Sequence, residues 1–256
     1  MSEIQNGPSQ LGWRYVFFGR VGPPHSFLTM PRPFSVDMKH RDAPLAGRLT
    51  VTIERMQVIA VVEAQQEFDD LYTLRNVVQD MAAILTDCAN LSSGQVFEVQ
   101  LVSVHDVRRG RSIVFDPGAG ALAQSSPGEP IDISELVHLA WSEPSFRRAL
   151  ADFRSAIRYP GQTGFHCGRA IEALAHHFGP MNNTANIKAT RAKLRTALAI
   201  SKEMDSKFIR AAADPRHGGG PWLTDAERGE LMRAVREVMF RFAQMVKARR
   251  AGQASN

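Results

Sequence analysis

Pro117-Gly-Ala-Gly120 and Gln124-Ser-Ser-Pro-Gly-Glu-Pro130 divide this sequence of 256 residues into two parts with different patterns. Both stretches are rich in small residues and proline and have no apolar period, which is typical of a linker. Strand-like patterns precede them, and helical patterns follow. The sequence therefore predicts an α+β protein with a first domain over residues 1–122, a linker over 123–130, a second domain over 131–250 and a tail over 251–256.

The first domain has the alternation of apolar and polar residues that predicts half-buried strands. Leu49, Val51 and Ile53 alternate with threonines, and β-rich stretches cover residues 15–18, 56–62, 95–104 and 112–115. Apolar residues between Asp69 and Asn90 instead recur at three- and four-residue spacing, which predicts one long helix. We expect a mainly antiparallel β domain that senses or docks a partner.

The second domain is predicted to be a bundle of about five helices. Candidate N-cap residues are Ser142, Thr163, Thr184 and Ser201, and Thr224-Asp-Ala-Glu227 is a capping box. An apolar stripe of about six turns follows that box and predicts a long last helix.

Charge is distributed unevenly between the two halves. Residues 1–130 carry 11 Lys+Arg and 14 Asp+Glu, a net charge of −3, whereas residues 131–256 carry 20 and 12, a net charge of +8. A basic half suits a polyanion such as RNA, although a solvated helical surface has the same composition.

Several functional classes are disfavoured by the motifs that the sequence lacks. There is no Walker loop, Gly-x-Ser-x-Gly elbow, dinucleotide fingerprint or His-Glu-x-x-His pair, so common NTPases, hydrolases, dehydrogenases and zincins are unsupported. Cys88 and Cys167 are isolated, and we expect no metal, cofactor or disulfide. No basic segment followed by an apolar one occurs near Met1, and we expect a cytoplasmic protein.

The stretch from Phe208 to Gly220 contains the residues best suited to phosphate chemistry. Arg210 lies on a predicted helix beside Lys207, and Pro215 predicts the end of that helix at Asp214. Arg216 and His217 follow, and three glycines then permit a tight loop that can bring backbone close to a phosphate. On an earlier helix, His166, Arg169, Glu172 and His176 share one face and can line a common cleft, although a solvated or helix-packing face is the simpler interpretation.

Arg169-Ala-Ile-Glu172-Ala-Leu174, Leu194 to Leu198 and Arg210 to His217-Gly218 together resemble the HEPN superfamily over about residues 131–250. Many members are metal-independent ribonucleases of defence, toxin or RNA-processing systems, with an Arg-x(4 to 6)-His motif often completed across a dimer. The resemblance therefore implies a homodimer that acts on RNA.

The resemblance also implies roles for individual residues. His217 would be the general base or acid for attack of a ribose 2′-hydroxyl on phosphate, because its reference pKa lies near neutrality. Arg210 or Arg216 would stabilise the negative charge that develops on phosphate, and Glu172 would orient a catalytic group. Arg169, Lys207, Arg210 and Arg216 would bind nucleic acid.

Two alternatives remain open at this stage. Active members usually have a polar residue after the motif arginine, where this sequence has Ala211, which favours a non-catalytic binding or scaffolding module. In the other alternative, the N-terminal domain binds a small ligand and the bundle only dimerises.

Overall fold

The computed structural model describes residues 12–23, 27–39, 46–115, 132–216 and 223–254. The chain divides into two compact units, residues 1–117 and 118–256. The predicted linker over residues 123–130 lies outside the described ranges. The α+β fold with an antiparallel sheet followed by helices is as predicted.

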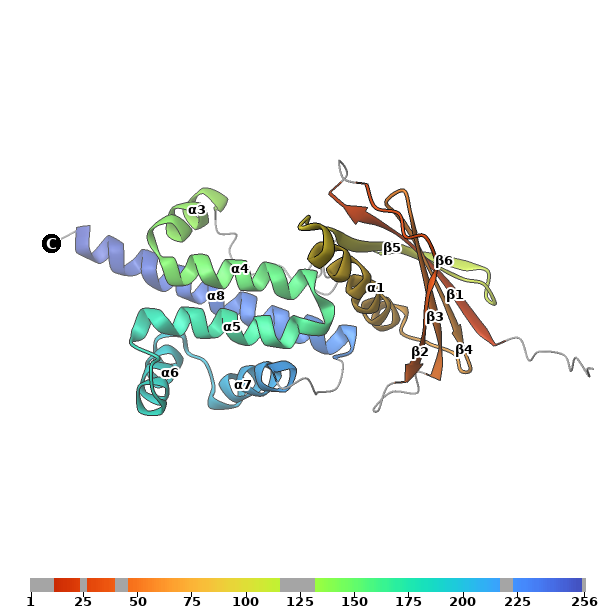
Figure 1. The fold of residues 1–256 in the computed structure, drawn as a ribbon. Helices are drawn as coiled ribbons and strands as arrows, with labels where there is room; N and C mark the ends of the chain where they lie inside the picture. Colours follow the sequence, from red (N-terminus) through yellow and green to blue (C-terminus); the bar gives the residue numbers. More distant parts are fainter. Residues whose placement is uncertain (1–11, 24–26, 40–45, 116–131, 217–222, 255–256) are drawn as a thin grey trace, which may run out of the picture. The chain divides into compact units, whose positions relative to one another are not determined.

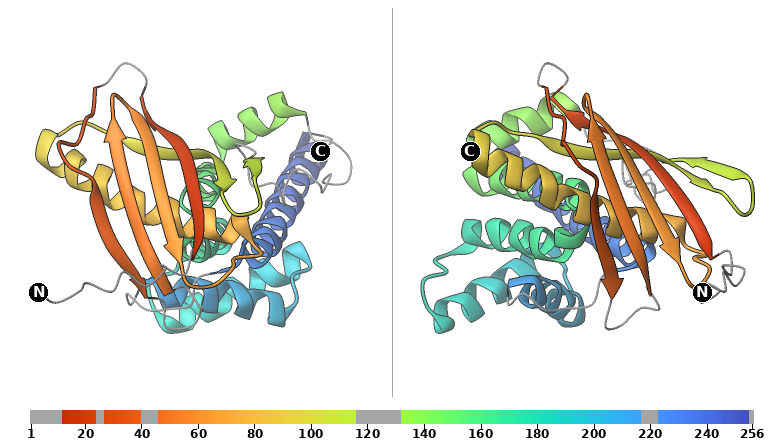
Figure 2. Two further views of the ribbon diagram at one scale, coloured as in Figure 1. Left: turned by 90° about the vertical axis from the view of Figure 1, so that its right-hand side faces the viewer. Right: turned by 45° about the vertical axis from the view of Figure 1, so that its right-hand side comes forward.

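Unit 1 is a six-stranded antiparallel sheet in the order β2-β3-β4-β1-β5-β6, with a helix on one face (Figures 1 and 2). Its elements are β1 (Trp13–Gly22), β2 (Phe34–Lys39), β3 (Ala46–Glu54), β4 (Gln57–Ala64), α1 (Leu71–Ser93), β5 (Glu98–Asp106) and β6 (Arg111–Val114). The predicted strands are confirmed, whereas β2 was not predicted.

The alternation along each strand decides which side chains form the core of unit 1. On β1, Tyr15 and Phe17 are buried, whereas Arg14, Phe18 and Arg20 are exposed. Side chains of a strand point to opposite faces in turn, so the buried residues of the sheet pack beneath α1 and the exposed ones lie on its other face.

Helix α1 begins and ends at residues with clear capping roles. The Asp70 carboxylate accepts hydrogen bonds from the backbone N–H groups of Tyr72 and Thr73, and Gly94 adopts the left-handed conformation that follows many helices. The helix extends about one turn beyond the predicted end at Asn90. The Asn90 side chain instead bonds both backbone groups of Phe97 and so connects α1 to the segment before β5.

Unit 2 is a helical bundle. Its elements are α3 (Ile133–Ser142), α4 (Pro144–Arg158), η1 (Pro160–Gln162), α5 (Thr163–Ala175), η2 (His176–Phe178), α6 (Thr184–Leu198), α7 (Lys202–Arg216) and α8 (Asp225–Ala254). Helix α3 was not predicted. Helix α8 extends into residues predicted to be a tail, and α7 continues through Pro215 rather than ending at Asp214.

Two of the predicted N-caps are confirmed. The backbone N–H of Thr224 donates to the Glu227 carboxylate at 2.8 Å, and the N–H of Glu227 donates to the Thr224 hydroxyl at 3.2 Å, which completes the capping box. The Ser201 hydroxyl accepts from the N–H of Met204 in the first turn of α7.

Three other predicted caps are wrong because their side chains have different partners or positions. Ser142 ends α3 and donates to the carbonyl of His138, and Thr163 donates to the Ala156 carbonyl at the end of α4. Asn183, one residue before Thr184, caps α6. Helix ends leave unpaired carbonyl groups, which attract such hydroxyls.

Two glycines allow α5 and α7 to pack at close range. A Cβ atom added at Gly164 would lie 2.4 Å from the carbonyl oxygen of Ala211, and one added at Gly168 would lie 2.3 Å from Ala212 Cβ. The backbone and Cβ atoms of α7 therefore occupy the space that larger α5 side chains would fill. This contact positions α7, which carries Arg210.

The two cysteines are expected to differ sharply in reactivity. Cys167 lies buried in the core of unit 2, and burial raises the pKa of its thiol to about 12, whereas Cys88 on α1 is exposed. At about pH 8, a colourless disulfide reagent that releases a coloured thiol should titrate Cys88 in the folded protein and both thiols in denaturant. Rapid reaction of Cys167 in the folded Cys88→Ser variant would contradict this burial.

Candidate functional site

The predicted Arg210–His217 pair is only partly described by the structure. Arg210 lies on α7 with its side chain exposed, on the opposite side of the helix from the buried Phe208, as predicted. Among the residues whose side chains the structure describes, which do not include Asp214, Arg210 has no ion-pair partner. His217 and the side chain of Arg216 lie outside the described part of the chain, so the convergence of the motif stays a prediction.

Ala211 occupies a position where packing requires a small side chain. It is partly buried against the core of unit 2, and its carbonyl oxygen is directed at Gly164 on α5. A larger polar side chain here would have to fit within the α5–α7 contact. The alanine that departs from the HEPN pattern therefore has a structural reason.

The other predicted site residues lie on two helices, Lys207 on α7 and Arg169 and Glu172 on α5. The Lys207 ammonium contacts the Glu230 carboxylate on α8 at 2.6 Å, and Glu172 lies half-buried on α5. Arg169, also on α5, pairs with Asp152 on α4 at 3.2 Å. The structure thus brings Arg169 into a cluster that was not predicted as such.

This cluster consists of Asp152, His166 and Arg169. One oxygen of Asp152, Oδ1, lies 3.4 Å from His166 Nδ1 and 3.2 Å from Arg169 Nε. The side chains of Asp152 and His166 are each 15% exposed, and that of Arg169 is 51% exposed. A carboxylate, an imidazole and a guanidinium therefore meet at the surface between α4 and α5.

The surroundings of His166 favour its neutral form. Burial lowers the pKa of the imidazole below its ordinary value, and the hydrogen bond and negative charge of Asp152 oppose this effect without cancelling it. A neutral ring that contacts a carboxylate through Nδ1 carries its proton there, so Nε2 keeps its lone pair. Nε2 has no hydrogen-bond partner among the described residues.

Helix α4 also presents a row of arginines, on a face about 140° around the helix from Asp152. Arg147, Arg154 and Arg158 are spaced by seven and four residues, so they lie within about 40° on one face of the helix, and all three are exposed. Arg148 is exposed on the adjacent face. Among the described residues, Arg147, Arg148 and Arg154 have no ion-pair partner. Helix α4 contains four arginines and one aspartate, Asp152.

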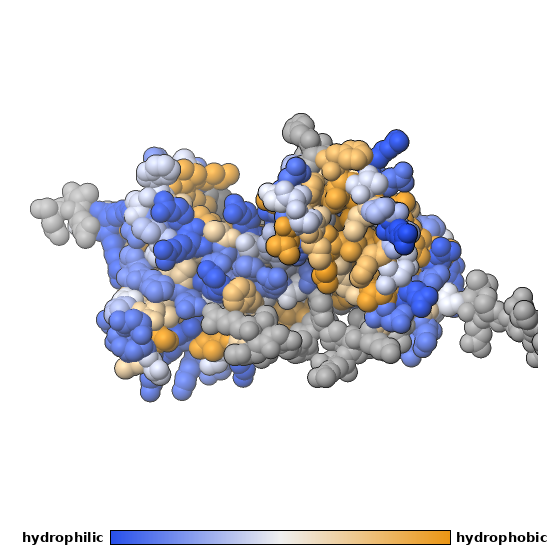
Figure 3. All heavy atoms as spheres, viewed as in Figure 1, coloured by the Kyte–Doolittle hydropathy of each residue, from blue (hydrophilic) through white to orange (hydrophobic). Residues whose placement is uncertain are grey.

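We name the residues Arg147, Arg148, Arg154, Arg158, His166 and Arg169 the α4–α5 basic surface. In Figure 1, α4 and α5 lie on the near side of the bundle. Figure 3 shows the same side, and its surface is mainly hydrophilic. The sequence signal for this surface is the arginine spacing on α4, which was not among the predicted site features.

Aromatic rings lie beneath two of these guanidinium groups. Arg158 lies 5.7 Å from the centroid of the Tyr159 ring, and Arg169 lies 5.6 Å from that of Phe165. Such stacking holds a guanidinium in place while its N–H groups remain able to bind an anion. The surface therefore combines the charge that binds phosphates with flat rings of the kind that nucleic-acid bases contact.

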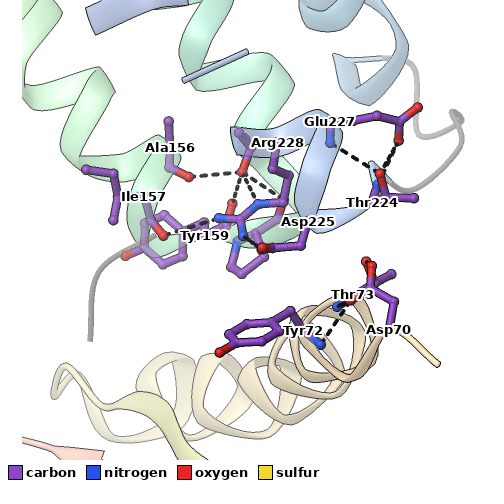
Figure 4. A network of polar contacts seen from close by, with 12 residues as sticks. Asp70, Tyr72, Thr73, Ala156, Ile157, Tyr159, Thr224, Asp225, Glu227 and Arg228 are labelled. Atoms are coloured by element: carbon purple, nitrogen blue, oxygen red, sulfur yellow. Dashed lines mark hydrogen bonds and ion pairs between the residues drawn. The ribbon is translucent and has the colours of Figure 1, made fainter. Parts of the chain in front are cut away.

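Arg228, which does not belong to this surface, is buried and has a structural role. Its side chain is 2% exposed, and Nε donates to the hydroxyl of Thr163 at 2.9 Å while Nη1 pairs with Asp225 at 3.2 Å. Figure 4 shows the guanidinium directed at the end of α4, where Ile157 and Tyr159 lie. Arg228 thus joins the first turn of α8 to the segment between α4 and α5.

The described residues contain neither a metal-binding cluster nor a membrane-spanning helix. None of their groups of three or more His, Cys, Asp or Glu side chains is arranged to hold a metal ion. In the same residues, no helix is both long enough and apolar enough to cross a membrane.

Comparison with known proteins places this architecture in a family. The model of the DUF8168 N-terminal domain matches residues 15–115, and the model of the DUF8168 C-terminal domain matches residues 133–247; both are described as domains of unknown function. No curated protein and no solved structure shows significant similarity to the sequence. The two matches follow the division into a sheet unit and a helical unit, and together they cover most of the chain. The protein therefore belongs to the DUF8168 family.

Proposed function

We propose that this protein acts on RNA and that its C-terminal unit binds the sugar-phosphate backbone through the α4–α5 basic surface. The observation that carries the proposal is the exposed row of Arg147, Arg154 and Arg158. Arginine donates several N–H groups in a planar fork that suits phosphate oxygens. Binding a polyanion would offset the mutual repulsion of these charges.

The dimensions of the row suit a nucleic-acid strand. Arg147 and Arg158 are 11 residues apart, which corresponds to about 16 Å along a helix axis. This length allows contacts with successive phosphates, and the Tyr159 ring, which lies against Arg158, can contact an unstacked base. The HEPN resemblance adds the choice of RNA and the formation of a homodimer.

The same resemblance adds cleavage to the proposal. In that version His217 would accept a proton from a ribose hydroxyl, Arg210 or Arg216 would stabilise the charged phosphate, and Glu172 would orient one of them. Incubating RNA with the wild-type protein and the His217→Ala variant in EDTA tests this step. Intact RNA with retained binding would favour the non-catalytic module.

The binding surface is tested with the Arg147→Gln/Arg154→Gln variant. Because each phosphate contact to single-stranded RNA releases counterions, we expect the slope of log affinity against log salt to be smaller by about 1.4 in this variant. At low salt the affinity should fall at least about tenfold, since two charge-assisted hydrogen bonds are lost. Fluorescence anisotropy with a labelled single-stranded RNA measures both quantities.

The Arg14→Gln/Arg20→Gln variant is the matched control, because it removes the same charge from the exposed sheet face of unit 1. Its RNA affinity should remain close to that of the wild type. Equal loss in both variants would mean that net charge, and not the α4–α5 basic surface, decides binding. Binding that is insensitive to salt would contradict the proposal.

A further inference from the structure

We propose that the face of the unit 1 sheet opposite α1 is an interface at which two copies of this chain pair, with β1 and β4 at its centre. In the left view of Figure 2 this face is turned toward the viewer, α1 lies behind the sheet, and no described element of unit 1 covers it. The surface lies outside residues 131–250, which carry the HEPN resemblance, and the inference goes beyond the proposed RNA binding.

The centre of the face is apolar. Phe18 on β1 is paired with Ile59 on β4, and Val16 is paired with Val61 in the same two strands. Phe18 and Ile59 are 44% and 43% exposed, and the two valines are partly exposed. Scattered apolar residues are normal on a protein surface, whereas a contiguous group such as this one indicates an interaction site.

A row of alternating charges borders this centre. Asp37, Arg48, Glu63 and Arg14 follow one another across β2, β3, β4 and β1 at paired positions, and all four are exposed. Two positive and two negative charges leave the row neutral, so it favours neither a polyanion nor an anionic membrane surface. It suits a partner that presents the same alternation in the opposite order, which a second copy turned by 180° does.

A two-fold axis parallel to β1 and β4 and midway between them makes the face complementary to itself. Rotation about this axis keeps the level of each residue along the strands and places β1 of one copy opposite β4 of the other. Because Arg14 is paired with Glu63 in the sheet, Arg14 then faces Glu63 of the second copy. By the same rule Phe18 faces Ile59 of the second copy, and each contact occurs twice, as in any isologous dimer.

The dimensions of the face are sufficient for a dimer. Strands lie about 4.8 Å apart and rise about 3.4 Å per residue, so six strands of about six residues present roughly 600 Å². Two such faces bury roughly 1,200 Å² together, the lower limit for a specific interface. Stacked sheets cross at about 30°, which displaces the facing strands by about 5 Å at the level of Arg14, and a long arginine side chain can bridge this displacement.

The charges at the border select the orientation of the two copies more than they add affinity. An exposed ion pair contributes less than about 1 kcal/mol, so neutralising Arg14 should leave the dimer largely formed. Reversing the charge of Arg14 or Glu63 instead places like charges opposite one another at both symmetry-related contacts, which disfavours the pairing. Charge reversal is therefore the sharper test.

Sedimentation velocity of the full-length protein over a range of concentrations tests the interface. The wild-type protein should form a species of twice the chain mass of 28.3 kDa. Ile59→Glu should raise the dimer dissociation constant at least about 100-fold, because it places two carboxylates in the apolar centre. Ile84→Glu is the matched control on the outer side of α1, where Ile84 is 54% exposed, and it should dimerise like the wild type. Circular dichroism checks that each variant is folded.

Mixing two charge-reversal variants tests the orientation. Arg14→Glu and Glu63→Arg should each raise the dissociation constant at least about tenfold, because like charges face one another in their homodimers. An equimolar mixture should dimerise with an affinity close to that of the wild type, because both contacts of the mixed dimer then join opposite charges. Mixing does not restore the Arg14–Glu63 pair within either chain, so recovery would come from the contact between chains.

The outcomes decide the proposal without reference to RNA. A wild-type protein that stays monomeric would overturn it and leave the face open to a different protein. A dimer that persists in Ile59→Glu would also overturn it, because the contact would then lie elsewhere in the chain. Charge-reversal variants that are monomeric both alone and when mixed would overturn the pairing of β1 with β4. The RNA affinity of the α4–α5 basic surface is measured separately and stands or falls by itself.

Discussion

Replacing Arg228 with methionine is expected to lower the free energy of unfolding by about 3 kcal/mol. The wild-type guanidinium is almost fully buried, and its Nε and Nη1 groups bond Thr163 and Asp225. Methionine has a similar length but no donor, so it leaves the Asp225 carboxylate without its buried cation and the Thr163 hydroxyl with one bond fewer. Chemical denaturation followed by far-UV circular dichroism measures the change.

The Arg210→Met variant is the control for this substitution. It removes the same side chain from an exposed site, where even an i,i+4 ion pair contributes only a few tenths of a kcal/mol, so stability should change by less than about 0.5 kcal/mol. The double variant Arg228→Met/Asp225→Asn should recover part of the loss, because the carboxylate left alone is removed as well. Equal stability of the Arg228→Met and wild-type proteins would show that the buried network contributes nothing.

Gly168→Ala is expected to destabilise the bundle by about 1–3 kcal/mol, although alanine ordinarily favours a helix. The added methyl group would lie 2.3 Å from Ala212 Cβ and 3.1 Å from the carbonyl oxygen of Phe208, so α5 and α7 must separate. Gly164→Ala should have an effect of the same size, since its methyl group would meet the Ala211 carbonyl oxygen. Denaturation curves of the two variants give these values directly.

Gly252→Ala provides a matched comparison within a helix of the same unit. Gly252 lies in α8, and a Cβ atom added there would have no neighbour within 4 Å. Its replacement should stabilise the protein by up to about 1 kcal/mol, the ordinary difference between the two residues in a helix. Stabilisation by Gly168→Ala as well would mean that α5 and α7 do not pack as closely as described.

The candidate site shows where prediction from the sequence reached its limit. The spacing of His166, Arg169 and Glu172 indicated a shared face of one helix, since such spacing is a property of the helix itself. Asp152 belongs to another helix, and the rotation of α4 against α5 decides that it meets His166 and Arg169. Local patterns do not contain that rotation, which follows from the packing of the two apolar faces.

The N-caps illustrate the same limit at the level of single hydroxyl groups. Thr224 and Glu227 each accept a hydrogen bond from the backbone N–H of the other, and both lie within four residues, so the local sequence was sufficient to predict their bonds. The Thr163 hydroxyl could bond a backbone N–H group of its own helix or a carbonyl group at the end of α4. In the structure it donates to the Ala156 carbonyl. A hydroxyl near a second helix end therefore cannot be assigned from its local sequence alone.

The periodic apolar patterns were sufficient for the division into a sheet and a bundle, the long helix of unit 1 and most helices of unit 2, because period and capping act over a few residues. The close contact of Gly164 and Gly168 with α7, the burial of Arg228 and the meeting of Asp152 with His166 were not predictable in this way. Each depends on atoms from segments far apart in the chain, whose distances are established only when their apolar faces pack together.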